Sequence, residues 1–205
     1  MPIGQQTVSE FLDSIAAKTP TPGGGAVAAS VGALAAALAG MVVSYSLGKK
    51  NLADHQPELQ AAAAHLARAR ALMLELVAED ERAYGAVNEL MKLPEGDPRR
   101  AEELPPAAVA ATHAPLAVMA AACDLLRLFE RLAPITNRHL RSDLAIAAVL
   151  ADATTRAGVW NVRINLPLLR ELGLEPPQGG TIETSAHDLL RNSARLAAAI
   201  ESACA

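Results

Sequence analysis

Apolar residues recur along the chain at helical spacing, and the stretches that carry this pattern are separated by clusters of proline and glycine. The sequence holds no run of alternating β-branched and polar residues of the kind that predicts a strand. It therefore predicts an all-α fold, and the short connections indicate an up-and-down helical bundle. The predicted helices cover residues 7–17, 26–47, 57–91, 105–132 and 139–159, and a last one begins near Ser185 and runs to the C-terminus.

Local signals mark several of the predicted helix ends. Thr7 and Glu10 have the spacing of a capping box, so a helix is expected to begin there. Pro57 is expected in the first turn of a long helix. Pro105-Pro106 is expected to open the next helix, which should bend at Pro115.

The composition bounds the size of the fold and its assembly. A chain of 205 residues is long enough to bury a core as one domain, expected to span residues 1–205. Alanine, the best helix former, accounts for 45 residues and aromatic residues for only 2%, so the apolar side chains are mostly small. Few bulky residues are available to cover this apolar surface, which favours a homo-oligomer, and a homodimer is the commonest closed form.

Charge and cysteine content narrow the classes of partner and compartment. A net charge of −4 offers no basic surface for nucleic acid. Cys123 and Cys204 lie far apart, as expected of reduced thiols, and the N-terminus lacks the pattern of a signal peptide, so a cytoplasmic location is expected. Residues 26–47 are long enough to span a membrane, but alanine, glycine and serine dominate them, so a buried core helix is favoured over a membrane span.

Metal and nucleotide sites are not predicted. The five histidines form no HxxxH pair, and no thiols cluster with them, so no metal is expected. The glycines of Gly23-Gly24-Gly25 do not have the spacing of a dinucleotide-binding motif, and no strand precedes them. The chain is therefore expected to work without a metal or a prosthetic group.

Residues 18–25, KTPTPGGG, are the most informative stretch of the sequence. Pro22 and the proline two residues earlier restrict the backbone, whereas Gly23-Gly24-Gly25 lets it approach a neighbour or a ligand closely. The helix that follows presents free N–H groups at the same point, which suits an anion or a polar ligand. The alternative is a flexible connector, although such a connector has little use for prolines.

Three further groups of polar residues allow two interpretations each. Asp80 lies four residues before Tyr84, so the two share a helix face that is either solvated or able to transfer protons. Ser142 and Asp143 interrupt an apolar stretch, either as a helix cap or as a carboxylate suited to general acid–base catalysis. Lys49-Lys50 follows a helix end, where lysines stabilise the helix dipole or meet an anionic ligand.

Asn161, Arg163 and Asn165 alternate with apolar residues, and this segment is expected to be extended. Its amide and guanidinium groups would then lie on one side and suit a carboxylate or a heterocycle with a lactam edge. An ordinary amphipathic connection is the alternative. A turn is expected to follow, around Gly173 and Gly179-Gly180.

Several of these segments form a characteristic series along nearly the whole chain. They are TPTPGGG at residues 19–25, the alanine-rich helix to Met41, Gly48-Lys49-Lys50, Asp80 with Ala83-Tyr84, SDLA at residues 142–145 and NVRINL at residues 161–166. In this order they resemble the cyclodeaminase/cyclohydrolase family, the domain found at the C-terminal end of formiminotransferase-cyclodeaminase.

The resemblance implies a dimer of all-α bundles that acts on one-carbon derivatives of tetrahydrofolate. The sequence shows no formiminotransferase domain, which favours a stand-alone enzyme that hydrolyses 5,10-methenyltetrahydrofolate to 10-formyltetrahydrofolate by acid–base catalysis without a metal. One alternative is the cyclodeaminase, which closes 5-formiminotetrahydrofolate with loss of ammonia. A second alternative is a helical protein that binds folate without catalysis.

The same resemblance suggests roles for individual residues. Asp143, supported by Ser142, is expected to transfer the proton, and Asp80 is expected to line the same cleft. The lysines and the arginine are expected to attract the carboxylates of the folate glutamates, and the two asparagines to contact polar edges. The expected substrate-binding residues are Pro22, Gly23, Gly24, Gly25, Lys49, Lys50, Asn161, Arg163 and Asn165.

Overall fold

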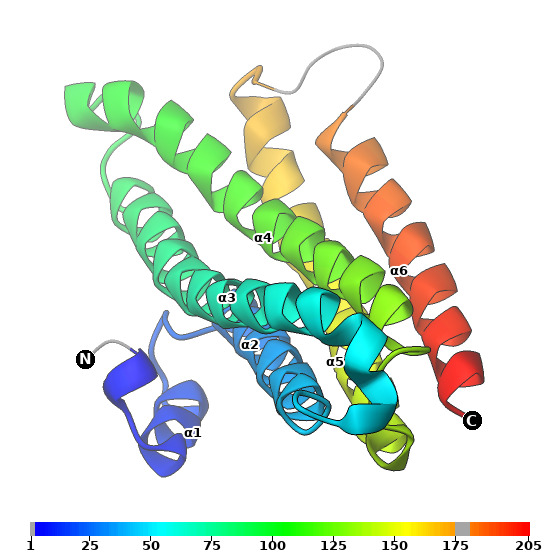
Figure 1. Cartoon of the computed structure of the whole chain (residues 1–205). Coiled ribbons are helices and arrows are strands. Elements are labelled where there is room, and N and C mark those ends of the chain that lie inside the picture. Colours follow the sequence, from blue (N-terminus) through cyan, green and yellow to red (C-terminus); the bar gives the residue numbers. More distant parts are fainter. Residues whose placement is uncertain (1–2, 175–180) are drawn as a thin grey trace.

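The computed structural model describes residues 3–174 and 181–205, and over these residues the protein is all-α, without strands (Figure 1). The α-helices are α1 Val8–Ala16, α2 Gly24–Ser44, α3 Gln56–Leu90, α4 Pro98–Leu132, α5 Arg141–Glu171 and α6 Ile182–Cys204. Short 3-10 helices, Ile3–Gln5, Lys50–His55 and Arg138–Leu140, precede α1, α3 and α5. The predicted all-α class is confirmed.

Four long helices form the centre of the bundle. In the ring α2–α3–α4–α5 each helix packs against its two neighbours, and α6 covers α4 and α5 (Figure 1). Small residues make this packing close: a Cβ atom at Gly32 of α2 would lie 2.9 Å from Met73 Sδ of α3 and 3.2 Å from Thr154 Cγ2 of α5. The small side chains predicted from composition therefore allow α2 to approach two helices at once.

Helix α4 begins earlier than the sequence analysis predicted. The Asp97 side chain accepts bonds from two backbone N–H groups of the first turn, at 2.8 and 3.3 Å, and Pro98 opens the helix. The predicted start at Pro105-Pro106 is wrong, because these prolines lie inside α4. The carbonyls that they leave without a helical partner belong to Ala101 and Glu102, which are exposed, so water can satisfy them.

Helix α5 continues through the segment that was expected to be extended. Its buried residues Val162, Leu166 and Leu169 recur at spacings of three and four, so the segment is helical and the predicted extended conformation is wrong. In a helix Asn161 and Asn165 lie on one face, whereas Arg163, two residues from each of them, points away from that face.

The chain turns after α5 as predicted at one of the two glycine positions. Gly173 has φ +68°, a left-handed conformation that favours glycine at the end of a helix. Gly179-Gly180, where the same turn was expected, lies outside the described residues.

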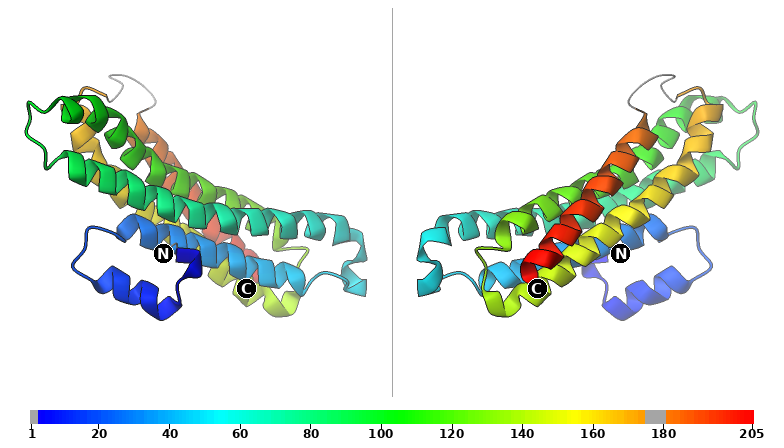
Figure 2. Two further views of the ribbon diagram at one scale, coloured as in Figure 1. Left: turned by 90° about the vertical axis from the view of Figure 1, so that its left-hand side faces the viewer. Right: turned by 90° about the vertical axis from the view of Figure 1, so that its right-hand side faces the viewer.

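Helix α1 lies to one side of the bundle, nearest α2 in both views of Figure 2. The predicted capping box is present: the Thr7 hydroxyl accepts from Glu10 N at 3.2 Å, and Thr7 N donates to the Glu10 carboxylate at 2.7 Å. None of the nine residues of α1 is buried. Val8 and Leu12 are exposed and Phe11 and Ile15 are half-buried, so the apolar face of this helix is only partly covered by the rest of the chain.

Two of the described helices, α2 and α4, are long and apolar enough to cross a membrane by length and composition. In each, 56% of the most apolar window is buried against other helices of the bundle. This burial is typical of core helices in a soluble protein, which pass the same test.

Candidate active site

A cavity of about 260 Å³ lies at the N-terminal end of α2, where segments from four parts of the chain meet. The connection between α1 and α2 covers one side, and α3, α4 and α5 supply the others. The residues that line it are Pro20, Thr21, Gly23, Gly24, Gly25, Asp80, Tyr84, Ala111, Asn161, Ile164 and Asn165.

The carboxylate of Asp80 packs directly on the backbone of Gly25. A Cβ atom at position 25 would overlap both carboxylate oxygens, so a larger residue there would displace the Asp80 side chain. Asp80 is half-buried, and this burial, with a smaller effect from the charge of Glu81, raises the pKa of Asp80 to about 6. A carboxyl group with this pKa can both take up and release a proton near neutral pH.

The other two glycines of the turn differ in what they require. A Cβ atom at Gly24 would lie 3.1 Å from Asn161 Oδ1, so glycine allows α5 to approach the start of α2. At Gly23 the nearest atom would be 3.9 Å away, and its backbone is extended, which any residue can adopt. The close packing therefore depends on Gly24 and Gly25.

Two asparagines lie one helical turn apart on the cavity face of α5. Asn165 Nδ2 donates to Ala111 O of α4 at 2.7 Å and to Asn161 O at 3.0 Å. The Asn165 side chain is therefore held between two helices. Both asparagines line the cavity together with Asp80, three of the residues that the sequence analysis expected in one cleft with Asp143.

Five residues of the cavity wall were not among the predicted site residues: Pro20, Thr21, Tyr84, Ala111 and Ile164. Tyr84, four residues after Asp80, is 45% exposed, and Ile164 is 74% exposed, so both lie at the rim. The sequence signal that could have identified Tyr84 is its position on the same helix face as Asp80. Ala111 contributes from α4, and nothing in its own sequence environment distinguishes it from the other alanines of that helix.

Four further predicted residues, Lys49, Lys50, Ser142 and Asp143, lie at the opposite end of the α2·α5 pair. Ser142 and Asp143 are in the first turn of α5, and Asn161 is 18 residues further along the same helix, about 27 Å at 1.5 Å per residue. Lys49 and Lys50 follow the far end of α2. Within one chain the structure does not bring these four residues to the glycine turn.

One hydrogen bond ties the two helix ends together at that opposite end. Asn137 N donates to Ser46 Oγ at 2.8 Å, so the residues after α2 and those before α5 share one end of the bundle. Residue Leu140 occupies the N-cap position of α5, with no side-chain cap bond. Neither Ser142 nor Asp143 therefore caps this helix.

Arg163 and Pro22 lie outside the cavity wall. The Arg163 guanidinium sits over the Trp160 ring at 5.3 Å from its centroid, and its Nη2 lies 2.9 Å from His187 Nε2 of α6. Arg163 is thus directed toward α6, away from the face that carries the asparagines. Pro22 shapes the turn between two lining residues, Thr21 and Gly23, but does not itself line the cavity.

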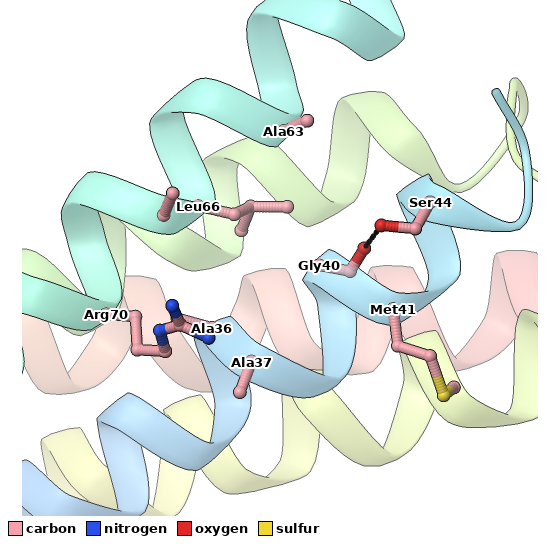
Figure 3. Close-up of a pocket in the computed structure, with 9 residues that line it drawn as sticks. Ala36, Ala37, Gly40, Met41, Ser44, Ala63, Leu66 and Arg70 are labelled. Atoms are coloured by element: carbon pink, nitrogen blue, oxygen red, sulfur yellow. Dashed lines mark hydrogen bonds between the residues drawn. The ribbon is translucent and has the colours of Figure 1, made fainter.

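A second cavity of about 270 Å³ lies between α2 and α3 (Figure 3). Its walls are mostly alanine, leucine and methionine, and Arg70 is its one charged residue. The Ser44 hydroxyl donates to Gly40 O at 2.8 Å, so it is already bonded within α2. This cavity lacks a carboxylate and is not suited to proton transfer. Among residues 3–174 and 181–205, no three His, Cys, Asp or Glu side chains gather as a metal site needs.

Comparison with known proteins agrees with this arrangement of helices and motifs. The profile of the formiminotransferase-cyclodeaminase family matches residues 7–174, which include the glycine turn, Asp80 and both asparagines. The chain belongs to this family. The resemblance noted from the sequence motifs is therefore confirmed.

Members of the formiminotransferase-cyclodeaminase family differ in what surrounds the shared domain. A methenyltetrahydrofolate cyclohydrolase of Methylorubrum extorquens is 33% identical over 166 residues, 79% of this chain and 80% of that protein. The formimidoyltransferase-cyclodeaminase of Mus musculus is 33% identical over 76% of this chain, which matches 30% of its length. The crystal structure of a formiminotetrahydrofolate cyclodeaminase from Thermotoga maritima aligns with a TM-score of 0.78 at 32% identity, covering 98% of this chain and 93% of that one.

Proposed function

We propose that the protein hydrolyses 5,10-methenyltetrahydrofolate to 10-formyltetrahydrofolate in the cavity at the start of α2. One observation carries the proposal: the carboxyl group of Asp80 lines this cavity, packs on the helix start, and has a pKa raised to about 6. The methenyltetrahydrofolate cyclohydrolase at 33% identity supports the choice of substrate.

The proposed reaction moves only water and protons. The ionised Asp80 takes a proton from a water molecule as its oxygen bonds to the methenyl carbon, which is cationic in the substrate. The new hydroxyl group on this carbon then loses its proton as N5 gains one and the bond from the carbon to N5 breaks, which leaves the formyl group on N10. One proton is released overall, so the step requires no redox group and no metal.

The other groups of the cavity are suited to hold the substrate. Asn161 and Asn165 present amide groups to a heterocycle, and Tyr84 and Ile164 offer apolar surface at the rim for an aromatic ring. At about 260 Å³ the cavity is smaller than typical drug-sized ligand pockets, which begin at roughly 300 Å³. It suits the reacting ring system, while the glutamate tail of folate extends beyond it.

We further propose that the active form is a homodimer in which a second copy covers the outer face of α2 and α1. Helix α2 has no charged residue, and its outward face carries Val27 and Leu34 at a spacing of seven, with Leu34 60% exposed. Helix α1 has no buried residue, and a helix this short is marginal without a packing partner. A second copy would bury both surfaces.

The distribution of the predicted site residues supports this symmetric pairing. Leu34 lies midway between Gly24 and Ser44, so a two-fold axis near it would set the start of one α2 beside the end of its partner. Lys49, Lys50, Ser142 and Asp143 of one copy would then lie near the glycine turn of the other. The lysines would be placed to attract the folate carboxylates, and Asp143 to assist Asp80.

The principal alternative is the formiminotetrahydrofolate cyclodeaminase reaction, which releases ammonia. The Thermotoga maritima cyclodeaminase, with a TM-score of 0.78 over nearly the whole chain, favours this alternative. A third function, folate binding without catalysis, would use the same cavity but leave Asp80 without a chemical role.

An assay with both substrates tests the proposal. The purified protein is expected to speed the loss of the methenyltetrahydrofolate chromophore well above the spontaneous rate, without added metal. Ammonia release from formiminotetrahydrofolate, without methenyl hydrolysis, would replace the proposal by the cyclodeaminase, and saturable binding with neither reaction would support the binding protein. We also propose a cytoplasmic, soluble enzyme; recovery of the protein in the membrane fraction would contradict this.

A further inference from the structure

A proline inside α4 leaves one backbone carbonyl next to the cavity without its helical partner. Pro115 has no N–H group, so it cannot donate to the carbonyl of Ala111 four residues earlier. Both residues are buried. A buried carbonyl is costly unless another donor reaches it, so this position demands a bond from outside α4.

The side chain of Asn165 supplies that bond. Its Nδ2 donates to Ala111 O at 2.7 Å and to Asn161 O at 3.0 Å. Both acceptors are carbonyl oxygens, which can only pair with the N–H₂ side of an amide, so the orientation of the side chain is determined. With both N–H bonds used, the amide oxygen is the group that Asn165 has left to offer in the cavity.

The crossing of α4 and α5 is unusually close just before this contact. A Cβ atom at Gly158 would lie 2.5 Å from Met119 Cγ and 3.4 Å from Pro115 O. Gly158 therefore allows α5 to pack closely against α4 near Pro115, where one backbone hydrogen bond of α4 is missing. Asn165 lies two turns further along α5 and reaches the free carbonyl of Ala111.

We propose that Pro115 is a positioning residue for substrate binding. By leaving the Ala111 carbonyl free, it fixes Asn165 so that the amide oxygen of Asn165 accepts a hydrogen bond from an N–H group of the substrate. Such donors lie along the amide and amino edge of a pterin ring. This inference rests on the proposed function, because it assigns the ligand group that the same cavity recognises.

A double-mutant cycle in enzyme activity tests the inference. Pro115→Ala restores an N–H group that competes for the Ala111 carbonyl, so KM is expected to rise about 5- to 10-fold while kcat stays within about twofold. In an Asn165→Ala background the same change should alter KM by less than about twofold. The matched control is Pro106→Ala in the same helix, whose freed carbonyl is exposed, and it should leave KM unchanged.

Equal effects of Pro115→Ala in both backgrounds would show a merely structural role and overturn the inference. A second cycle, in thermal stability, does not depend on turnover. Asn165→Asp places a carboxylate against the Ala111 carbonyl and should lower Tm; adding Pro115→Ala should restore about 3 °C or more, because the new N–H occupies that carbonyl. Pro106→Ala should restore nothing.

The two cycles separate the two proposals. If the wild-type protein shows no turnover but Pro115→Ala restores the Tm of Asn165→Asp, the proposed reaction is rejected and the role of Pro115 is kept. A Tm that Pro115→Ala does not restore would reject that role, whatever the activity.

Discussion

The two ends of the α2·α5 pair differ in how they treat polar groups. At the glycine end, Asp80, Asn161 and Asn165 are partly buried, and close backbone approaches at Gly24 and Gly25 hold them together. At the lysine end, Lys49 and Lys50 follow the end of α2, and Asp143 lies in the first turn of α5. The cavity at the start of α2 is the polar site described for the glycine end.

This difference shows what a helix bundle can do with one subunit and where it needs two. Burial raises the pKa of Asp80, which lines a cavity with neighbours on several sides. At the lysine end Lys50 is exposed, and exposed charges act mainly through attraction of ligands, which salt screens. The glycine end is therefore suited to chemistry, and the lysine end to capture of an anionic tail, provided that a partner subunit brings the two together.

The largest expected effect comes from replacing Asp80, the proposed proton carrier of the glycine end. Asp80→Asn should lower kcat by about 10²- to 10⁴-fold, the usual contribution of general acid–base catalysis. In the wild type, kcat/KM should fall as pH decreases through about 6, because protonated Asp80 cannot accept a proton from water. Steady-state kinetics from pH 5 to 8 would measure both.

Glu79→Gln is the matched control, since Glu79 is exposed on the same helix, and it should retain full activity. Equal losses in both variants, or a flat pH profile, would remove Asp80 from the chemistry.

Next in size is a complementation that tests whether both ends form one site. Asp143→Asn should be strongly impaired if the partner supplies Asp143. Mixing and exchanging Asp80→Asn with Asp143→Asn should restore about one quarter of wild-type activity, because half of the dimers are mixed and one of their two sites is intact. Activity of the mixture and its mass by light scattering are the measurements.

Leu34→Glu, which places a charge on the uncovered face of α2, should yield monomers and abolish the recovery. Full activity of Asp143→Asn, or an active monomer, would confine the site to the glycine end.

A smaller effect is expected from Gly25→Ala. The new methyl group would push the Asp80 carboxylate off the helix start, so kcat should fall about 10-fold or more, with a loss of stability of about 1–3 kcal/mol from overpacking. Gly85→Ala, in α3 with no heavy atom within 4 Å of the added Cβ, should instead gain about 0.5–1 kcal/mol. Chemical denaturation and kinetics of both variants would decide; an unaffected Gly25→Ala would show that the close approach is dispensable.

The sequence predicted the helical class and the glycine-turn end of the site for physical reasons that can be named. Apolar spacing identified the helices, and the restricted prolines beside free glycines pointed to a close backbone approach at residues 23–25. The segment 161–165 was misassigned because alternation over only five residues does not distinguish an extended segment from a helix. The helical spacing of Val162, Leu166 and Leu169 is visible only over a longer window.

The start of α4 was misassigned because Pro105-Pro106 has the same helix-start character as Pro98, which follows the capping residue Asp97. Within one chain Asp143 and the glycine turn lie apart, because α2 and α5 run in opposite directions in an up-and-down bundle, so the beginning of one lies beside the end of the other. The bond from Asn165 to Ala111 links residues 54 apart in sequence and could not be predicted from either motif.

The connection between α1 and α2 supplies Pro20, Thr21 and Gly23 to the cavity wall. It joins α1, which has no buried residue, to α2, which is largely buried. If α1 detached from the bundle, this connection would be displaced first, whereas the cavity wall formed by α3 and α5 would stay in place. Dilution that separates a dimer should therefore expose the cavity on the side of this connection well before the bundle unfolds. Turnover per subunit would then fall as the protein concentration falls, while the helix content stays constant.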